Sequence, residues 1–248
     1  MSVEATRFVG AALCADGWVA VVHRADGFDH AGVFEEFGAL WGRYEESAER
    51  IAVPVPVGLR ERGEEPRPPE RLARELLGPR RSAVYDAPVR EATRKQRYQT
   101  ASRVNERKAG RGLTREAFDE ATAVAEVDEL LSAIPEARPI VVEAHPELCF
   151  RAFRGEPLEY DGRTAAGYAE RLRALAAFDP DAPVDVVAAS EATGGREVAV
   201  ADVLDATALA LTVRPGEGEL HSLPDDPPTD PEGLPMRMVY RADRPLTP

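Results

Sequence analysis

The feature that most constrains this chain is an apolar run that stops at a His-Pro-Glu triplet. Residues 140–142, Ile-Val-Val, predict a buried strand. Glu143, His145 and Glu147 follow, and Pro146 is tolerated in the first turn of a helix, where a carboxylate is also favoured. Two carboxylates and an imidazole therefore gather where a core strand gives way to a helix. Because open α/β sheets bind ligands beyond the carboxyl ends of their strands, this junction is the strongest candidate site.

Length and apolar content favour a globular protein. The 248 residues are enough for one large α/β domain or two small ones, and 44% hydrophobic residues are enough for a core. The sequence has no run of eighteen apolar residues, which excludes a membrane-spanning helix. The opening residues, MSVEATRFVG, lack the basic and apolar regions of a signal peptide, so we expect a cytoplasmic protein.

The charge balance excludes one class of function. A net charge of −13 argues against a generally cationic nucleic-acid binder, because phosphate contacts need Lys and Arg. Only Lys95 and Lys108 are lysines among the 31 basic residues. A high-GC genome explains arginine in place of lysine, and a halophilic host would also explain the acidic surface. We attribute the acidity to habitat rather than to a ligand.

Alternating and helical patterns predict an α/β fold. Strands are expected over 7–13, 17–22 and 31–34, and the Asp16-Gly17 pair predicts a hairpin turn between the first two. A further strand is expected over 51–59, where two prolines interrupt its hydrogen bonding. Residues 60–70 are expected to be an exposed loop, 184–188 and 236–240 strands, and 216–231 irregular. Helices are expected over 34–46, 69–77, 89–108, 114–132 (with Thr114 as N-cap), 146–154, 164–178 and 198–213.

These elements predict a single domain over residues 1–248. A helical insertion is expected at about 63–132, and an irregular tail at 214–248.

Four carboxylates are candidate metal ligands or catalytic groups. Glu143 and Glu147 lie at the junction, and Asp202 and Asp205 share one face of an otherwise apolar helix because they are three residues apart. Acidic residues that converge at strand ends can hold two divalent ions for phosphodiester cleavage. In the plainer interpretation, Glu143 ends a strand, Glu147 begins a helix, and the two aspartates lie on a solvated helix face. Spacing alone does not decide between this interpretation and a metal site.

Other chemistry finds less support. The four histidines have no metal-ligand spacing, and the sequence has neither a glycine-rich phosphate loop nor a G-x-S-x-G motif. Cys14 and Cys149 lie in apolar segments and are expected to be free thiols, with Cys149 buried between Leu148 and Phe150. A basic cluster that includes Arg94 and Arg97 is either a solvated helix face or a phosphate contact.

Five segments, in order along most of the chain, resemble the domain-of-unknown-function 429 family. VVEAHPELCFRAFRG resembles its E-x-HPE-x-x-F signature, and ARELLGPRRSAVYDAPVREA and GRGLTREAFDEATAVAEVDELL resemble two further family segments. ADVLDATALALTV resembles its DD-x-LDA helix, and GLPMRMVY resembles its closing strand. The family is described as predicted ribonuclease H-like nucleases, so the resemblance is specific about fold and about chemistry.

The resemblance implies a ribonuclease H-like fold, with a mixed five-stranded sheet that begins as a three-strand meander and is flanked by helices. Acidic residues on the first strand, the fourth strand and the last helix would hold two ions, Mg²⁺ or Mn²⁺. The implied metal ligands are Glu147 and Asp202, and the implied catalytic set also includes Glu143 and Asp205. His145, Arg94 and Arg97 are the expected substrate contacts, with nucleic acid as the expected partner.

Two early positions depart from the family pattern. Where it reads G-x-DG-x-x-x-GW, this chain has Ala12 at the aspartate position, and where it reads I-D-x-P-x-GL, this chain has Pro54. Neither residue offers a side-chain oxygen. Three hypotheses follow: a degraded relative of metal-dependent nucleases that binds rather than cleaves, an active divalent-metal-dependent nuclease, or a structural or assembly protein.

Overall fold

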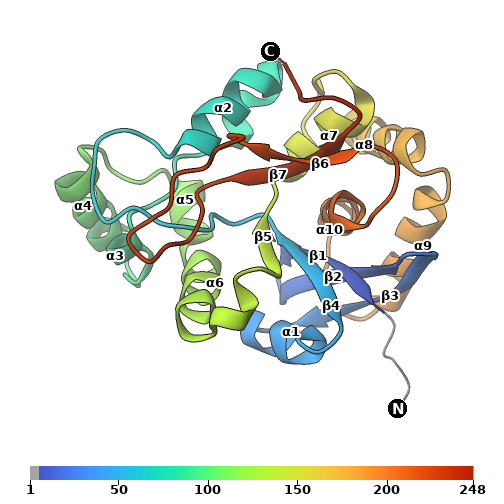
Figure 1. The fold of residues 1–248 in the computed structure, drawn as a ribbon, viewed down its shortest axis with the longest axis horizontal. Coiled ribbons are helices and arrows are strands. Elements are labelled where there is room, and N and C mark those ends of the chain that lie inside the picture. The colour runs from blue at the N-terminus through green and yellow to red at the C-terminus, as the bar shows by residue number, and fades with distance from the viewer. Residues whose placement is uncertain (1–5, 248) are drawn as a thin grey trace.

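The computed structural model describes residues 6–247, and its centre is a mixed five-stranded sheet. The strand order is β3-β2-β1-β4-β5; β1 to β3 form an antiparallel meander, and β4 and β5 continue the sheet parallel to β1 (Figure 1). This confirms the expected ribonuclease H-like arrangement. The strands are β1 (Arg7–Cys14), β2 (Gly17–Arg24), β3 (Gly27–Phe34), β4 (Ala48–Val53) and β5 (Val141–Glu143).

The N-terminal expectations are tested only in part. Residues 1–5, which belong to the segment that we searched for a signal peptide, lie outside the described residues. Within residues 6–247, none of the helices has the length and apolar character that crossing a membrane requires.

Turn chemistry fixes where the first strands end. Gly17 follows Asp16 in the β1–β2 hairpin and has a φ of 113°, which favours glycine. β4 stops at Val53 rather than continuing to Leu59, because Pro54 has no N–H to donate to a ladder. The predicted strand 51–59 was therefore too long, and its second half is a loop at the carboxyl end of β4.

One α-helix, α1, lies between β3 and β4, and five more, α2 to α6, separate β4 from β5. They are α1 (Phe37–Tyr44), α2 (Pro68–Leu77), α3 (Arg90–Thr93), α4 (Tyr98–Ala109), α5 (Arg115–Asp119) and α6 (Ala121–Ala133), with short 3₁₀ turns at Gly78–Ala83 and Pro135–Ala137. Thr114 caps α5 by accepting the Ala117 N–H, as predicted. The helices predicted over 89–108 and 114–132 are each split in two, since neither pattern revealed the breaks at residues 94–97 and at Glu120.

Four helices follow β5, and the last of them is the centre of the molecule. They are α7 (Pro146–Arg154), α8 (Ala165–Phe178), α9 (Ala182–Ala192) and α10 (Val200–Val213). The strand predicted over 184–188 is wrong, because these residues belong to α9. Val186 and Ala189 are buried while Val184 and Val187 are exposed, and a short run of β-branched residues cannot be distinguished from a helix by pattern alone.

The tail is more ordered than expected. Within the region 214–248 predicted as irregular, β6 (Glu219–Leu223) and β7 (Met238–Ala242) form a separate antiparallel pair. Met238 and Tyr240 of β7 pack on Leu77 of α2 and Leu148 of α7. β7 confirms the strand predicted over 236–240, with its bounds shifted by two residues. β6 escaped prediction because it is half-exposed and its partner lies beyond a long loop.

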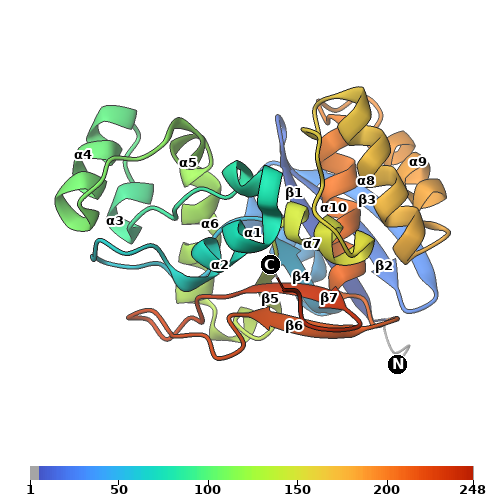
Figure 2. The same ribbon diagram turned by 90° about the horizontal axis from the view of Figure 1, so that it is seen from above.

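Helix α10 lies between the main sheet and the β6–β7 pair (Figures 1 and 2). Almost every residue from Val203 to Val213 is buried, and the helix crosses β1 at Gly10. A Cβ at Gly10 would lie 2.0 Å from the Ala206 carbonyl oxygen and 2.2 Å from the Ala210 nitrogen. A side chain at Gly10 therefore cannot be accommodated without moving α10.

We predict that Gly10→Ala destabilises the protein by about 3 kcal/mol or more, because the added methyl group meets backbone atoms rather than a flexible side chain. Chemical denaturation measures the change. Gly38→Ala is the matched control, since a Cβ at this exposed position of α1 meets nothing within 4 Å. Equal stability of the two variants would contradict the close approach of α10 to β1.

Candidate functional site

A cavity of about 400 Å³ opens at the carboxyl ends of β1, β4 and β5. We call it the junction pocket. Its walls come from the ends of these strands, from α2 and the turn after it, and from α7, α8, α10 and β7. Its lining residues are Ala12, Leu13, Pro54, Pro56, Glu70, Arg80, Ala83, Val84, Tyr85, Glu120, Glu143, His145, Pro146, Glu147, Asp161, Gly162, Arg163, Arg171, Ala201, Asp202, Asp205 and Met238.

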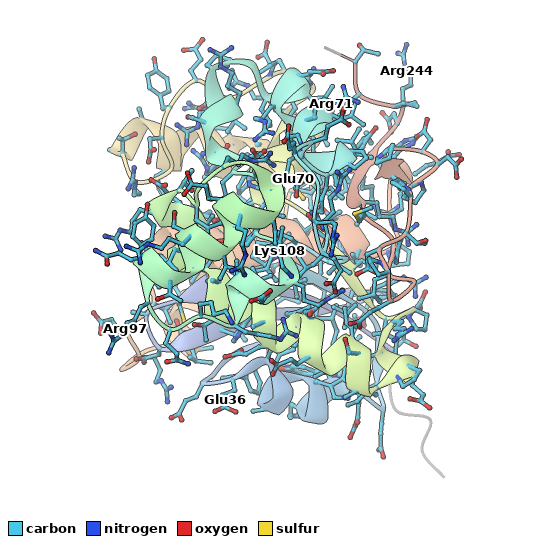
Figure 3. All side chains as sticks on the ribbon, turned by 90° about the vertical axis from the view of Figure 1, so that its left-hand side faces the viewer. Glu36, Glu70, Arg71, Arg97, Lys108 and Arg244 are labelled. Atoms are coloured by element: carbon cyan, nitrogen blue, oxygen red, sulfur yellow. The ribbon has the colours of Figure 1, made fainter. Side chains whose placement is uncertain are left out.

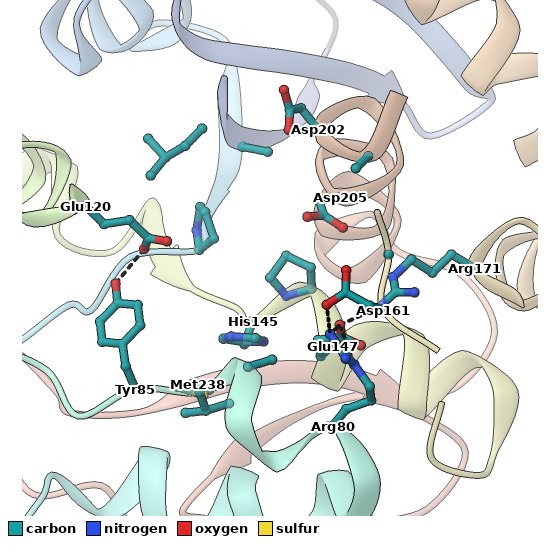
Figure 4. Close-up of a pocket in the computed structure, with 18 of the residues that line it drawn as sticks. Arg80, Tyr85, Glu120, His145, Glu147, Asp161, Arg171, Asp202, Asp205 and Met238 are labelled. Atoms are coloured by element: carbon teal, nitrogen blue, oxygen red, sulfur yellow. Dashed lines mark hydrogen bonds and ion pairs between the residues drawn. The ribbon is translucent and has the colours of Figure 1, made fainter. Parts of the chain in front are cut away.

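The structure brings most of the predicted site residues together. Glu143, His145, Glu147, Asp202 and Asp205 all line the junction pocket, the first three from the β5–α7 junction and the aspartates from α10. Figure 4 shows all of them except Glu143 with labels. Arg94 and Arg97 are not among its lining residues.

Glu143 is held in a buried ion pair. Its two carboxylate oxygens accept hydrogen bonds from Arg67 Nη2 at 2.7 and 3.0 Å, and Oε2 also accepts the Val57 N–H at 2.8 Å. Burial raises the pKa of Glu143, and Arg67 opposes that rise. Although burial lowers the pKa of Arg67, Glu143 and Glu70 raise it above its ordinary value. Residues 60–67 form a largely exposed loop as expected, but its last residue, Arg67, is 2% exposed, so the end of the loop is buried.

Glu147 is also paired with arginine. Its Oε1 accepts hydrogen bonds from Arg171 Nη2 and from Arg80, the latter at 3.1 and 3.3 Å. Arg171 is fixed in turn by the carbonyl groups of Tyr160 and Gly167. The other oxygen of Glu147, Oε2, is buried and has no hydrogen-bond partner within residues 6–247. One edge of this carboxylate is therefore occupied, and the other edge is not.

Asp202 and Asp205 differ in their bonding. Asp202 Oδ2 accepts the Ala199 N–H at 2.9 Å and so caps α10, and burial raises its pKa. Asp205 makes no side-chain hydrogen bond or ion pair with the part of the chain that the structure describes. Burial, and then the nearby Glu147 carboxylate, raise the pKa of Asp205 to about 8. The Asp205 carboxyl therefore holds its proton more tightly than an ordinary aspartate, unless a cation lies beside it and favours the ionised form.

His145 and Cys149 are not an activated pair. Burial lowers the pKa of His145, so its imidazole is neutral, although Glu147 acts in the opposite direction. Cys149 is fully buried, and burial raises its pKa to about 12, which leaves the thiol inert. This confirms the expected buried thiol, and both cysteines are free.

Glu120 is a further carboxyl group of the pocket lining, and Tyr85 is its hydrogen-bond partner. Tyr85 Oη donates a hydrogen bond of 2.5 Å to Glu120 Oε2. Burial raises the pKa of Glu120, and burial together with Glu120 raises the pKa of Tyr85 well above its ordinary value. Figure 4 shows this pair on the side of the pocket away from Asp202 and Asp205.

The basic cluster is mostly neutralised by neighbouring carboxylates. Arg94 is paired with Asp128 at 2.8 Å and with Glu129 at 3.3 Å. Lys108 is paired with Glu91 at 2.7 Å. Arg97 is exposed and extends from the outer edge of the molecule (Figure 3). These ion pairs weaken the case for phosphate contacts at this surface.

The residues present do not fit a site for two divalent ions. Ala12 and Pro54 line the pocket without a donor atom, and Glu143 and one oxygen of Glu147 are bound by arginines. Within residues 6–247, no group of three His, Cys, Asp or Glu side chains is arranged to hold a metal ion. The Mg²⁺ or Mn²⁺ expected from the sequence therefore lacks a complete set of ligands.

Sequence reasoning missed the arginines that organise the pocket. Arg67 pairs with Glu143 across 76 positions, and Arg80 pairs with Glu147 across 67 positions. Arg171 lies on α8 at a position that no motif singled out. Local patterns carry no signal for such pairs, because they are created by the packing of α2 and α8 against α7.

We predict that Arg67→Ala destabilises the protein by about 3–5 kcal/mol, because it leaves the Glu143 carboxylate buried without its cation. Urea denaturation measures this effect. Arg71→Ala is the control: its ion pair with Glu75 on the same helix is exposed, so a change within about 0.5 kcal/mol is expected. A small effect of Arg67→Ala would contradict a structural role for the pair.

A second prediction concerns pH. Because the folded state holds the Asp205 proton more tightly than the unfolded state, the carboxyl lowers stability as pH rises from about 4 to about 8. At pH ~8, Asp205→Asn should raise the Tm by at least about 2–4 °C, which is the shift in Tm expected from the free energy of about one pKa unit. At pH ~4 the substitution should have little effect on the Tm.

The opposite sign is expected for Asp16→Asn. A hydrogen bond from the Glu197 N–H lowers the pKa of Asp16, so this variant should lower the Tm at neutral pH. A gain for Asp205→Asn that is the same at both pH values would show that the pKa of Asp205 is not raised.

Comparison with known proteins places the chain in a family. The model of the family described as "Protein of unknown function (DUF429)" matches residues 13–229, which include Pro54 and the β5–α7 junction but begin one position after Ala12. No curated protein and no solved structure matched the chain. The match covers most of the sequence, and the chain therefore belongs to the DUF429 family.

Proposed function

We propose that this protein is a degraded relative of metal-dependent nucleases, which binds a ligand in the junction pocket and does not cleave phosphodiester bonds. The observation that carries the proposal is the pairing of the β5–α7 carboxylates with arginines. Arg67 occupies both oxygens of Glu143, and Arg80 and Arg171 occupy Oε1 of Glu147. A two-metal mechanism needs such oxygens free to bind cations.

The opposite wall supports the same proposal. Ala12 and Pro54 stand at the carboxyl ends of β1 and β4, where the family pattern suggested by the sequence has aspartates. The pocket has polar groups elsewhere in its lining, but Ala12 and Pro54 offer no side chain that could bind a metal ion. A concave, polar cavity of this size suits a small molecule.

The active-nuclease alternative has one observation in its favour, which is the pair of carboxyls on α10. Asp205 makes no side-chain hydrogen bond or ion pair with residues 6–247 and lines the same cavity as Glu147. These groups offer at most a partial cage for one ion.

We predict that the purified protein does not cleave DNA or RNA above background with Mg²⁺ or Mn²⁺, at low or high salt. The double variant Glu147→Gln, Asp202→Asn is the comparison. Cleavage by the wild-type protein that the double variant abolishes would overturn the proposal and establish the nuclease. Cleavage that survives in the double variant would indicate a contaminating enzyme.

A restoration experiment tests the missing wall. Ala12→Asp combined with Pro54→Asp adds two carboxylates beside Asp202 and Asp205, so Mn²⁺ should raise the Tm of this variant much more than that of the wild type. The same titration with Gly38→Ala, far from the pocket, controls for surface binding. An equal Mn²⁺ effect on all three proteins would mean that positions 12 and 54 do not limit metal binding.

A further inference from the structure

We propose that the junction pocket binds a small aliphatic diamine or polyamine, with one ammonium group at Asp205 and Glu147 and the other at Glu120. This inference rests on the proposed binding function and names the chemical class of its ligand.

The pocket has an excess of negative charge that the protein does not neutralise. Among the described residues that line it are seven carboxylates and three arginines. Arg67, Arg80, Arg171 and Arg163 account for the pairing of Glu70, Glu143, Glu147 and Asp161. Asp202, Asp205 and Glu120 have no ion-pair partner in the described part of the chain. An anionic ligand would be repelled here, whereas a cationic ligand is attracted.

The deep wall offers hydrogen-bond acceptors that lack donors. Glu147 is 8% exposed, and its Oε2 is buried without a partner in residues 6–247. The Nδ1 atom of His145 is also buried without a hydrogen-bond partner in these residues. Asp205 is half-buried, lines the same pocket and makes no side-chain hydrogen bond with the described residues. A buried polar atom without a partner is unfavourable, so these atoms indicate a ligand that brings N–H groups. An alkylammonium group carries three such donors and a positive charge.

The acidic groups lie at two sides of the pocket. Figure 4 shows Asp205 and Glu147 toward one side, and Glu120 with Tyr85 toward the other. Leu13, Pro54 and Pro56 supply apolar lining. A ligand with a cationic group at each end and methylene groups between them matches this distribution of charge and apolar surface. A single metal ion matches it less well, because a cavity of about 400 Å³ is far larger than one ion.

The lack of a carboxylate at Ala12 and Pro54 contributes to the same inference. An alanine and a proline at these positions contribute apolar surface to the pocket lining. Aspartates there would instead fill the cavity with further negative charge.

The inference is tested by calorimetric titration of the full-length protein with putrescine, cadaverine and spermidine. Butylamine supplies one ammonium group, succinate reverses the charge, and Mg²⁺ and Mn²⁺ are the metal comparisons. We expect saturable binding of one diamine or polyamine per chain. Asp205→Asn and Glu120→Gln should each weaken it by at least about tenfold, which is about 1.4 kcal/mol, with butylamine weaker than putrescine.

The acidic surface requires a control, since a net charge of −13 attracts any polyamine weakly. Glu75→Gln removes an exposed carboxylate outside the pocket lining and should leave the affinity unchanged. Equal affinities for the wild type, Asp205→Asn and Glu120→Gln would overturn the inference, as would the absence of saturable binding.

A chain-length series keeps the test decisive if a variant fails to fold. The diamines of propane, butane, pentane and hexane should show a clear optimum with the wild-type protein, because the distance between the acidic sides is fixed. Equal affinity along the series would overturn the inference. Absence of amine binding without nuclease activity refutes the ligand class alone, whereas metal-dependent cleavage refutes the proposed function.

Discussion

The close packing of α10 on β1 is the constraint on which the rest of the structure depends. Gly10 has no side chain, so the backbone of α10 at Ala206 and Ala210 can approach the strand directly. This approach buries the apolar helix between the main sheet and the β6–β7 pair. It also fixes the depth at which Asp202 and Asp205, on the first turns of α10, reach the carboxyl edge of the sheet.

Buried arginines set the electrostatics of the site. Arg67 and Arg171 are each 2% exposed, and both bind carboxylates of the β5–α7 junction. A buried carboxylate without a cation is strongly unfavourable, so these pairs determine that Glu143 and one edge of Glu147 stabilise the fold. The same pairs leave Asp205 and Glu147 Oε2 as groups of the cavity lining that have no partner among the residues described by the structure. The division between structural and ligand-facing carboxylates is the basis for proposing binding rather than cleavage.

Much of the fold could be predicted because its signals are local. The β1–β3 meander follows from alternating apolar residues and the Asp16-Gly17 turn. The cap at Thr114 follows from a side chain three residues before its N–H donor, Ala117. The strand expected at 184–188 failed because Val184 and Val187 are apolar yet exposed on α9. The strand expected at 236–240 is present as β7, whereas β6 was missed because a short, half-exposed strand is not convincing without its partner.

By itself, the sequence determined the β1–β3 meander, the resemblance to the DUF429 family with the mixed sheet that it implies, and five candidate residues. These are Glu143, His145 and Glu147 at the β5–α7 junction and Asp202 and Asp205 on α10. Each depends on a local pattern or motif. Only the tertiary structure decided what those residues do. Arg67, Arg80 and Arg171 come from distant segments, and their ion pairs with Glu143 and Glu147 exist only once α2 and α8 have packed around α7. Charge compensation is a property of three-dimensional proximity, and no spacing along the chain encodes it.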